Sequence, residues 1–156
     1  MIRDVLLHPH PLLTRCAEPA TDPGPVVADL LDTMRSFGHC VGIAAPQIGE
    51  LVRVAVVDCS GHPKAPGAHG ELVLVNPVIV AASGSEVGRE GCLSIPELTG
   101  NVRRATAITV EADELRLEAE GFEARAIQHE IDHLDGLLFL DRVESPATDV
   151  FRRKRR

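Results

Sequence analysis

The pattern His-Glu-x-x-His at residues 129–133 constrains this chain more than any other stretch of it. On an α-helix, His129 and His133 lie one turn apart on the same face, where both imidazoles can bind one metal ion. Glu130 lies between them, and a carboxylate at that place can take a proton from a water that the ion activates. The alternative is an ordinary helix whose two histidines only complete an amphipathic face.

The residues around this pattern predict a helix with one buried side. Gly121 and Gly136 bracket the segment, and Gly136 stands where a left-handed C-terminal cap is expected. Apolar residues recur between these two glycines at helical spacing, so they form one face. They are Phe122, Ala126, Ile127, Ile131 and Leu134.

A catalytic metal site that keeps one position open for water needs a third protein ligand. Cys92 is the strongest candidate, because Gly91 before it lets the backbone approach closely and its neighbours are not those of a packed core strand. Cys16, Cys40 and Cys59 lack such a setting and suit small buried side chains. The chain has no Cys-x-x-Cys pair, which argues against a zinc ribbon or a thioredoxin-like redox site.

Three short segments follow one another along the chain. They are Val-Gly-Ile-Ala-Ala-Pro-Gln at residues 41–47, Glu-Gly-Cys-Leu-Ser at 90–94 and Gln-His-Glu-Ile-Asp-His at 128–133. In composition, order and spacing they resemble the three signature motifs of the peptide deformylases. The resemblance extends from about Val5 to Val143, so it covers most of the chain.

This resemblance implies a mononuclear metal site. Its ligands would be Cys92, His129 and His133, with water in the fourth position and Glu130 as general acid and base. In that family the ion is usually ferrous iron (Fe2+), and zinc (Zn2+), nickel (Ni2+) or cobalt (Co2+) can occupy the same site. One thiolate and two imidazoles suit several of these metals, so the ligand types do not select one.

The resemblance also implies a reaction: hydrolysis of the N-formyl group of formylmethionine on nascent polypeptides, with release of formate. Gln47 and the backbone N–H of Leu93 would bind the oxyanion, while the substrate chain would add as a strand beside Gly42. Residues expected around the substrate, several of them in an apolar methionine pocket, are Val41, Gly42, Glu90, Gly91, Phe122, Arg125 and Ala126.

One departure from the family pattern concerns the substrate side of the site. The first motif of the family begins Gly-x-Gly, whereas this chain has Cys40-Val41-Gly42. If the position needs a positive φ or a close backbone approach, Cys40 would be strained or would narrow the cleft; otherwise it is a half-buried cysteine in a slightly shifted loop. Two alternatives therefore stay open: a same-fold metal amidohydrolase acting on another N-acyl group, and a catalytically silent protein that binds N-termini.

The predicted fold is α+β, with antiparallel strands packed around a central helix that carries the His-Glu-x-x-His motif. With 156 residues, 44% of them hydrophobic, the chain suits one domain. We expect a catalytic domain at residues 1–145 and a short basic C-terminal tail at 146–156. Predicted elements besides the motif helix are a helix at 26–37 and strands at 52–57, 72–80, 107–111 and 115–119.

Charge and hydropathy bear on partners and location. The net charge of −7 argues against DNA as a partner, and we find no secretory or membrane-spanning segment. We therefore expect a cytoplasmic monomer that acts on formylated nascent peptides. Basic residues gather at 152–156, where a tail could dock on ribosomal RNA; a solvated, frayed terminus is the alternative.

Overall fold

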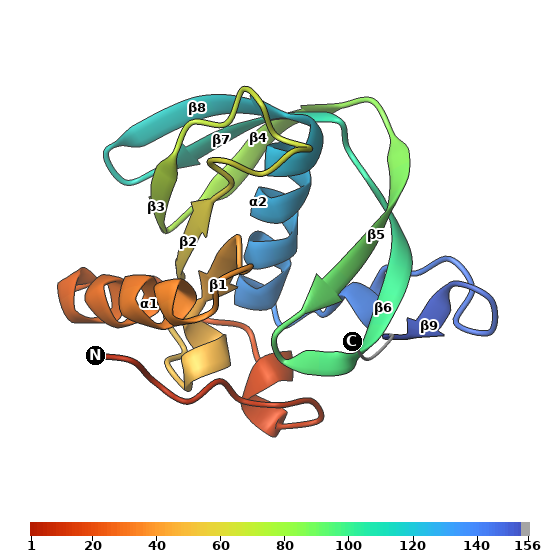
Figure 1. Cartoon of the computed structure of the whole chain (residues 1–156). Coiled ribbons are helices and arrows are strands. Elements are labelled where there is room, and N and C mark those ends of the chain that lie inside the picture. The colour runs from red at the N-terminus through yellow and green to blue at the C-terminus, as the bar shows by residue number, and fades with distance from the viewer. Residues whose placement is uncertain (154–156) are drawn as a thin grey trace.

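The computed structural model describes residues 1–153, in which three antiparallel three-stranded sheets surround one buried helix (Figure 1). That helix, α2, runs from Gly121 to Leu134 and contains the third motif. A second helix, α1 (Gly24–Ser36), packs against the sheet that holds the first motif. The α+β class is as predicted from the sequence. None of the described helices combines the length and apolar character needed to cross a membrane.

The first sheet has the strand order β1-β2-β3 and packs against both helices. Its strands are β1 (Gly42–Ala44), β2 (Val54–Asp58) and β3 (Glu71–Val75). Strand β2 lies in the middle and is a continuous apolar run, which suits a strand covered on both faces. A 3-10 helix at Ala45–Ile48 follows β1 at once and holds the end of the first motif.

The second sheet has the order β4-β7-β8, with strands at Val78–Ser83, Ala107–Ala112 and Leu115–Glu120. The prediction of one strand at residues 72–80 is wrong, because β3 and β4 belong to different sheets. Asn76 has a φ of 52° and its side chain bonds Ala20 and Asp113, while Pro77 has no N–H for a ladder. The chain therefore turns at this point and changes sheet.

The third sheet has the order β5-β6-β9, with strands at Glu86–Cys92, Ile95–Arg104 and Val150–Arg152. Strands β5 and β6 form a long hairpin beside α2 (Figure 1), and the second motif forms its tip, so Cys92 ends a strand. Part of the predicted basic tail is also a strand, since Thr99 on β6 pairs with Phe151 on β9. Residues 154–156 of that tail lie outside the described residues.

Helix α2 is buried on nearly all sides. The predicted apolar face is present: Ile127 and Leu134 are fully buried, and Phe122 packs on the core edge. Gly121 and Gly136 adopt positive φ values of 59° and 78°, which glycine tolerates without strain. Two 3-10 helices complete the structure, at Pro11–Thr14 and Phe139–Asp141.

Candidate metal centre and active site

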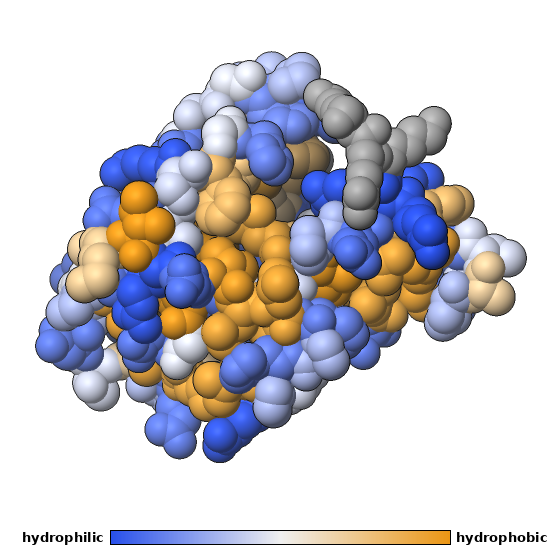
Figure 2. Space-filling model, turned by 60° about the horizontal axis from the view of Figure 1, so that its bottom comes forward, coloured by the Kyte–Doolittle hydropathy of each residue, from blue (hydrophilic) through white to orange (hydrophobic). Residues whose placement is uncertain are grey.

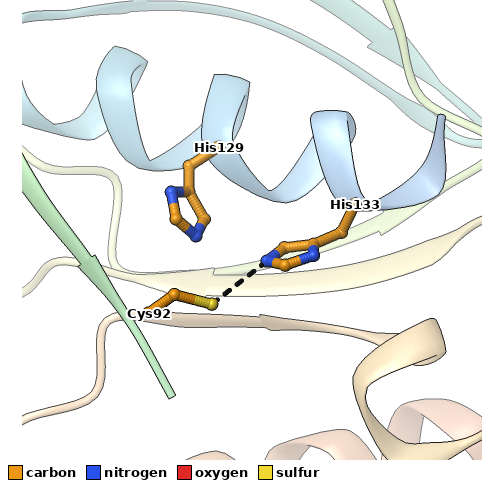
Figure 3. Close-up of side chains that lie close together, drawn as sticks. All are labelled: Cys92, His129 and His133. Carbon is orange, nitrogen blue, oxygen red and sulfur yellow. Dashed lines mark hydrogen bonds between the residues drawn. The ribbon is translucent and has the colours of Figure 1, made fainter. Parts of the chain in front are cut away.

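Three possible metal ligands come together between α2 and the end of β5 (Figure 3). Helix α2 presents His129 and His133 one turn apart, as the spacing predicts, and the Sγ atom of Cys92 lies 3.4 Å from Nε2 of His133. One ligand atom from each of the three residues lies within 4.8 Å of the other two. Since metal–nitrogen and metal–sulfur bonds are about 2.0–2.3 Å long, small shifts of the side chains let one ion reach all three.

The donor chemistry of this cluster also fits a divalent ion. Nδ1 of His129 lies 2.9 Å from a carboxylate oxygen of Glu90, which leaves Nε2 for the ion. Burial opposes a charge on His129, but contacts with Cys92 and Glu90 raise its pKa well above the usual value. Burial and the neighbouring His129 lower the pKa of His133. His133 is therefore the neutral imidazole of the pair, the form that binds a metal ion.

Glu90 is the centre of a buried ion-pair network behind the ligands. Arg104 donates two hydrogen bonds of 2.9 Å to its carboxylate, and Arg125 donates one of 2.8 Å. Burial alone would raise the pKa of Glu90, but Arg104 and His129 hold it well below its usual range. Arg104 also bonds Asp132 of α2 at 2.6 Å. Glu90 and Arg125, which were predicted to contact the substrate, therefore form ion pairs within the protein.

The general-base candidate, Glu130, lies beside the ligands and is only 4% exposed. Its Oε1 atom has no hydrogen-bond partner among the described residues. Burial raises the pKa of this carboxyl to about 7, against the opposing effect of His129. A Cβ atom at Gly42 would stand 2.7 Å from Oε2 of Glu130. Glycine at position 42 therefore leaves the room that the Glu130 carboxylate occupies.

Gln47 has its amide fixed in one orientation. Its Oε1 accepts a hydrogen bond from the backbone N–H of Ala44 at 3.0 Å, so Nε2 must face the other way. There it lies 3.1 Å from Oγ of Ser94 and 3.5 Å from Sγ of Cys92. Ser94 was not assigned a role from the sequence, although it belongs to the second motif. The NH2 group of Gln47 is thus held toward Ser94 and Cys92.

Cys92, His129, Glu130 and Gln47 line a cavity of about 460 Å³. Arg89, Pro96 and Arg153 line it without having been predicted from the sequence, because the strands β5, β6 and β9 were not expected. His133 is buried and does not line the cavity. A larger hollow, of about 920 Å³, borders β4 and β7 and contains no metal-ligand set. The predicted site residues that line the smaller cavity are Val41, Gly42, Gln47, Glu90, Gly91, Cys92, Leu93, Phe122, Arg125, Ala126, His129 and Glu130.

Cys40 lies at the wall of the same cavity. The non-glycine residues with positive φ in the described part of the chain are Asn76 and Glu114, so the expected backbone strain at Cys40 is absent. Its thiol donates to the carbonyl oxygen of Gly42 at 3.1 Å, and burial raises its pKa to about 12. Cys40 is therefore a neutral side chain that narrows the cleft next to Glu130.

Comparisons with known proteins agree with this geometry. The family model "Polypeptide deformylase" matches residues 2–149. The peptide deformylase of Thermomicrobium roseum is 49% identical over 126 residues, which are 77% of this chain and 71% of the relative. A crystal structure of a peptide deformylase from Legionella pneumophila matches with a TM-score of 0.84 and 36% identity, over 94% of this chain and 88% of that one.

A third relative is a class I type b peptide deformylase from Acinetobacter baumannii, whose crystal structure has Met-Ala-Ser bound. It matches with a TM-score of 0.81 and 33% identity, over 92% of this chain and 99% of that one. The chain therefore belongs to the polypeptide deformylase family, metal-dependent hydrolases that remove the formyl group from the N-terminal methionine of nascent polypeptides.

Proposed function

We propose that Cys92, His129 and His133 hold one divalent ion in this enzyme, and that Glu130 moves the proton during removal of the formyl group. One observation carries the proposal: three ligand atoms within 4.8 Å of one another lie beside a buried carboxylate oxygen without a partner. An ion bound there would make a nucleophile from water at neutral pH, polarise the formyl carbonyl and stabilise the ionised form of Glu130.

The protein groups around the reacting carbonyl have separate roles. Glu130 accepts a proton as the nucleophile attacks and gives it to the departing amine, for which a pKa near neutrality is suited. Nε2 of Gln47 and the backbone N–H of Leu93 donate to the oxyanion. Because burial between α2 and the β5–β6 hairpin limits water, these hydrogen bonds are stronger than in bulk solvent.

The substrate lies between two strand edges. Within residues 1–153, strands β1 and β5 each pair on one side only, and residues of both line the cavity, so each can bind an extended peptide by backbone hydrogen bonds. Met-Ala-Ser, as bound to the Acinetobacter baumannii relative, is the product expected from formyl-Met-Ala-Ser. The methionine side chain would contact Val41, Phe122 and Ala126.

We infer further properties that need separate tests. One cysteine sulfur and two imidazoles suit Fe2+, with Zn2+, Ni2+ or Co2+ as replacements, and a reducing cytoplasm would keep Cys92 reduced and able to bind the ion. The enzyme would act as a monomer on formylated nascent chains. Arg152 and Arg153, which precede further basic residues in the sequence, would favour contact with ribosomal RNA.

Formate release tests the proposed function. Protein purified without oxygen is expected to contain one equivalent of Fe2+ per chain and to release formate from formyl-Met-Ala-Ser. A chelator should abolish turnover, and added Fe2+ or Ni2+ should restore it, because the ion supplies the nucleophile. Cys92→Ala should bind the ion weakly and stay inactive. A chain that remains fully active after complete metal removal would refute the proposal.

Cys40 is the residue that bears on the second candidate function, hydrolysis of another N-acyl group, because its side chain lines the cavity. The Cys40→Gly variant removes a side chain from the cavity wall without relieving strain, so it should mainly change which acyl group fits. We expect the ratio of kcat/KM for formyl-Met-Ala-Ser to that for acetyl-Met-Ala-Ser to change by about tenfold. Unchanged kinetics on both peptides would remove Cys40 from the determinants of specificity.

A further inference from the structure

Two arginines of the sheet formed by β5, β6 and β9 line the cavity. Arg89 on β5 and Arg153 just after β9 both line the cavity that contains Cys92. On the face turned forward in Figure 2, hydrophobic side chains fill the middle and strongly hydrophilic ones lie on both sides. The whole chain has a net charge of −7, so two arginines at this one place differ from the general surface. We call Arg89 and Arg153 the basic rim.

Arg89 is held in place by uncharged partners. Its guanidinium donates to Oδ1 of Asn101 at 3.0 Å and to Oγ1 of Thr99 at 3.3 Å. Its Cζ atom stands 3.8 Å from the centre of the Phe151 ring. No carboxylate in the described part of the chain forms an ion pair with it, in contrast to Arg125, which bonds Glu90. Its position is thus fixed while its charge stays available.

Arg153 places a second positive charge over strand β5. Its backbone N–H donates to the carbonyl oxygen of Glu97 at 2.8 Å, which continues the pairing of β9 with β6. Its guanidinium lies against Gly91, where a Cβ atom would collide with it. Among residues 1–153 it forms no ion pair. Two positive groups therefore lie over the sheet of β5, β6 and β9, one at Gly91 and the other beside Asn101 and Thr99.

The spacing along β5 relates the basic rim to a position in the substrate. Arg89 is three residues from Cys92, and a strand rises about 3.3 Å per residue, so the two are about 10 Å apart along the strand. An extended peptide with its formyl group near Cys92 advances at the same rate. Its second or third residue therefore lies beside the rim.

We propose that the basic rim selects substrates with an acidic side chain at the second or third residue, a specificity that rests on the proposed function. The charge of Asp or Glu would be paired with arginines that have no carboxylate partner within residues 1–153. An exposed ion pair contributes little by itself, but here the guanidinium of Arg89 is already ordered by Asn101, Thr99 and Phe151. A lysine at the same substrate position would be disfavoured by like charge.

The test compares kcat/KM for formyl-Met-Ala-Glu, formyl-Met-Ala-Gln and formyl-Met-Ala-Lys, and for the matching peptides with the change at the second residue. We expect the Glu peptide of at least one series to be preferred over its Gln peptide by about threefold to tenfold at low salt, less in 0.5 M NaCl. The double variant Arg89→Gln/Arg153→Gln should lose this preference, and its metal content and urea unfolding midpoint report whether it is folded.

Arg103→Gln is the matched control. Arg103 is exposed on β6, pairs with Glu144 and does not line the cavity, so its variant should keep the preference. Equal rates on Glu and Gln peptides in both series, or a preference that survives the double variant, would refute substrate selection by the basic rim. Neither result would count against the deformylase reaction. Absence of turnover on all the peptides would instead count against the proposed function.

Discussion

Glu130→Gln is expected to lower kcat for formate release by about 10²-fold to 10⁴-fold, with the metal content unchanged. The amide has nearly the shape of the carboxylate and fits the space beside Gly42. It can neither accept the proton from the nucleophile nor return it to the leaving amine. Single-turnover kinetics and metal analysis of the same preparation measure the two quantities.

A matched variant and a cellular assay complete this experiment. Glu97→Gln makes the same chemical change at an exposed position on β6 outside the cavity, so it should leave kcat as it was. Turnover by Glu130→Gln at the wild-type rate would exclude Glu130 as the proton carrier. If the variant lacked turnover and yet supported growth in place of the wild type, the chain would act as a silent binder of N-termini.

Arg104→Leu is expected to lower the free energy of unfolding by about 3–5 kcal/mol. The Arg104 side chain is 5% exposed and forms ion pairs with Glu90 and Asp132. Its removal leaves two buried carboxylates without their main partner. Urea unfolding of the metal-free protein measures the loss, which avoids coupling between metal release and unfolding.

The same variant should also weaken metal binding by about 10-fold to 100-fold, because Arg104 acts through Glu90 on His129. Arg104→Lys keeps the charge but not the two-pronged hydrogen bond, so intermediate values of both quantities are expected. Arg103→Leu changes the preceding residue, which is exposed, and should lower the free energy of unfolding by no more than about 1 kcal/mol. Equal stability of Arg104→Leu and wild type would show that this network is not needed for the fold.

Local sequence patterns predicted the parts of this protein that depend on neighbouring residues. The helix that carries His129 and His133 follows from the spacing of its apolar residues, and the strands β7 and β8 follow from alternation. The hairpin of β5 and β6 was not predicted, because Gly88, Gly91 and Gly100 and several charged residues interrupt any alternating pattern. The change of sheet at Asn76 was not predicted, because it depends on a positive φ at a residue other than glycine, which the sequence pattern does not indicate.

The sequence by itself predicted the metal ligands and the proton carrier that we propose, because its three motifs resemble those of the deformylase family in residue type and spacing. Only the tertiary structure decided how these groups are held. Glu90 engages Arg104, Arg125 and His129, and Gly42 leaves room for Glu130. The basic rim depends on β9 reaching β6 from the far end of the chain. Such contacts join residues that are distant in sequence, and local periodicity contains no information about which of them will meet.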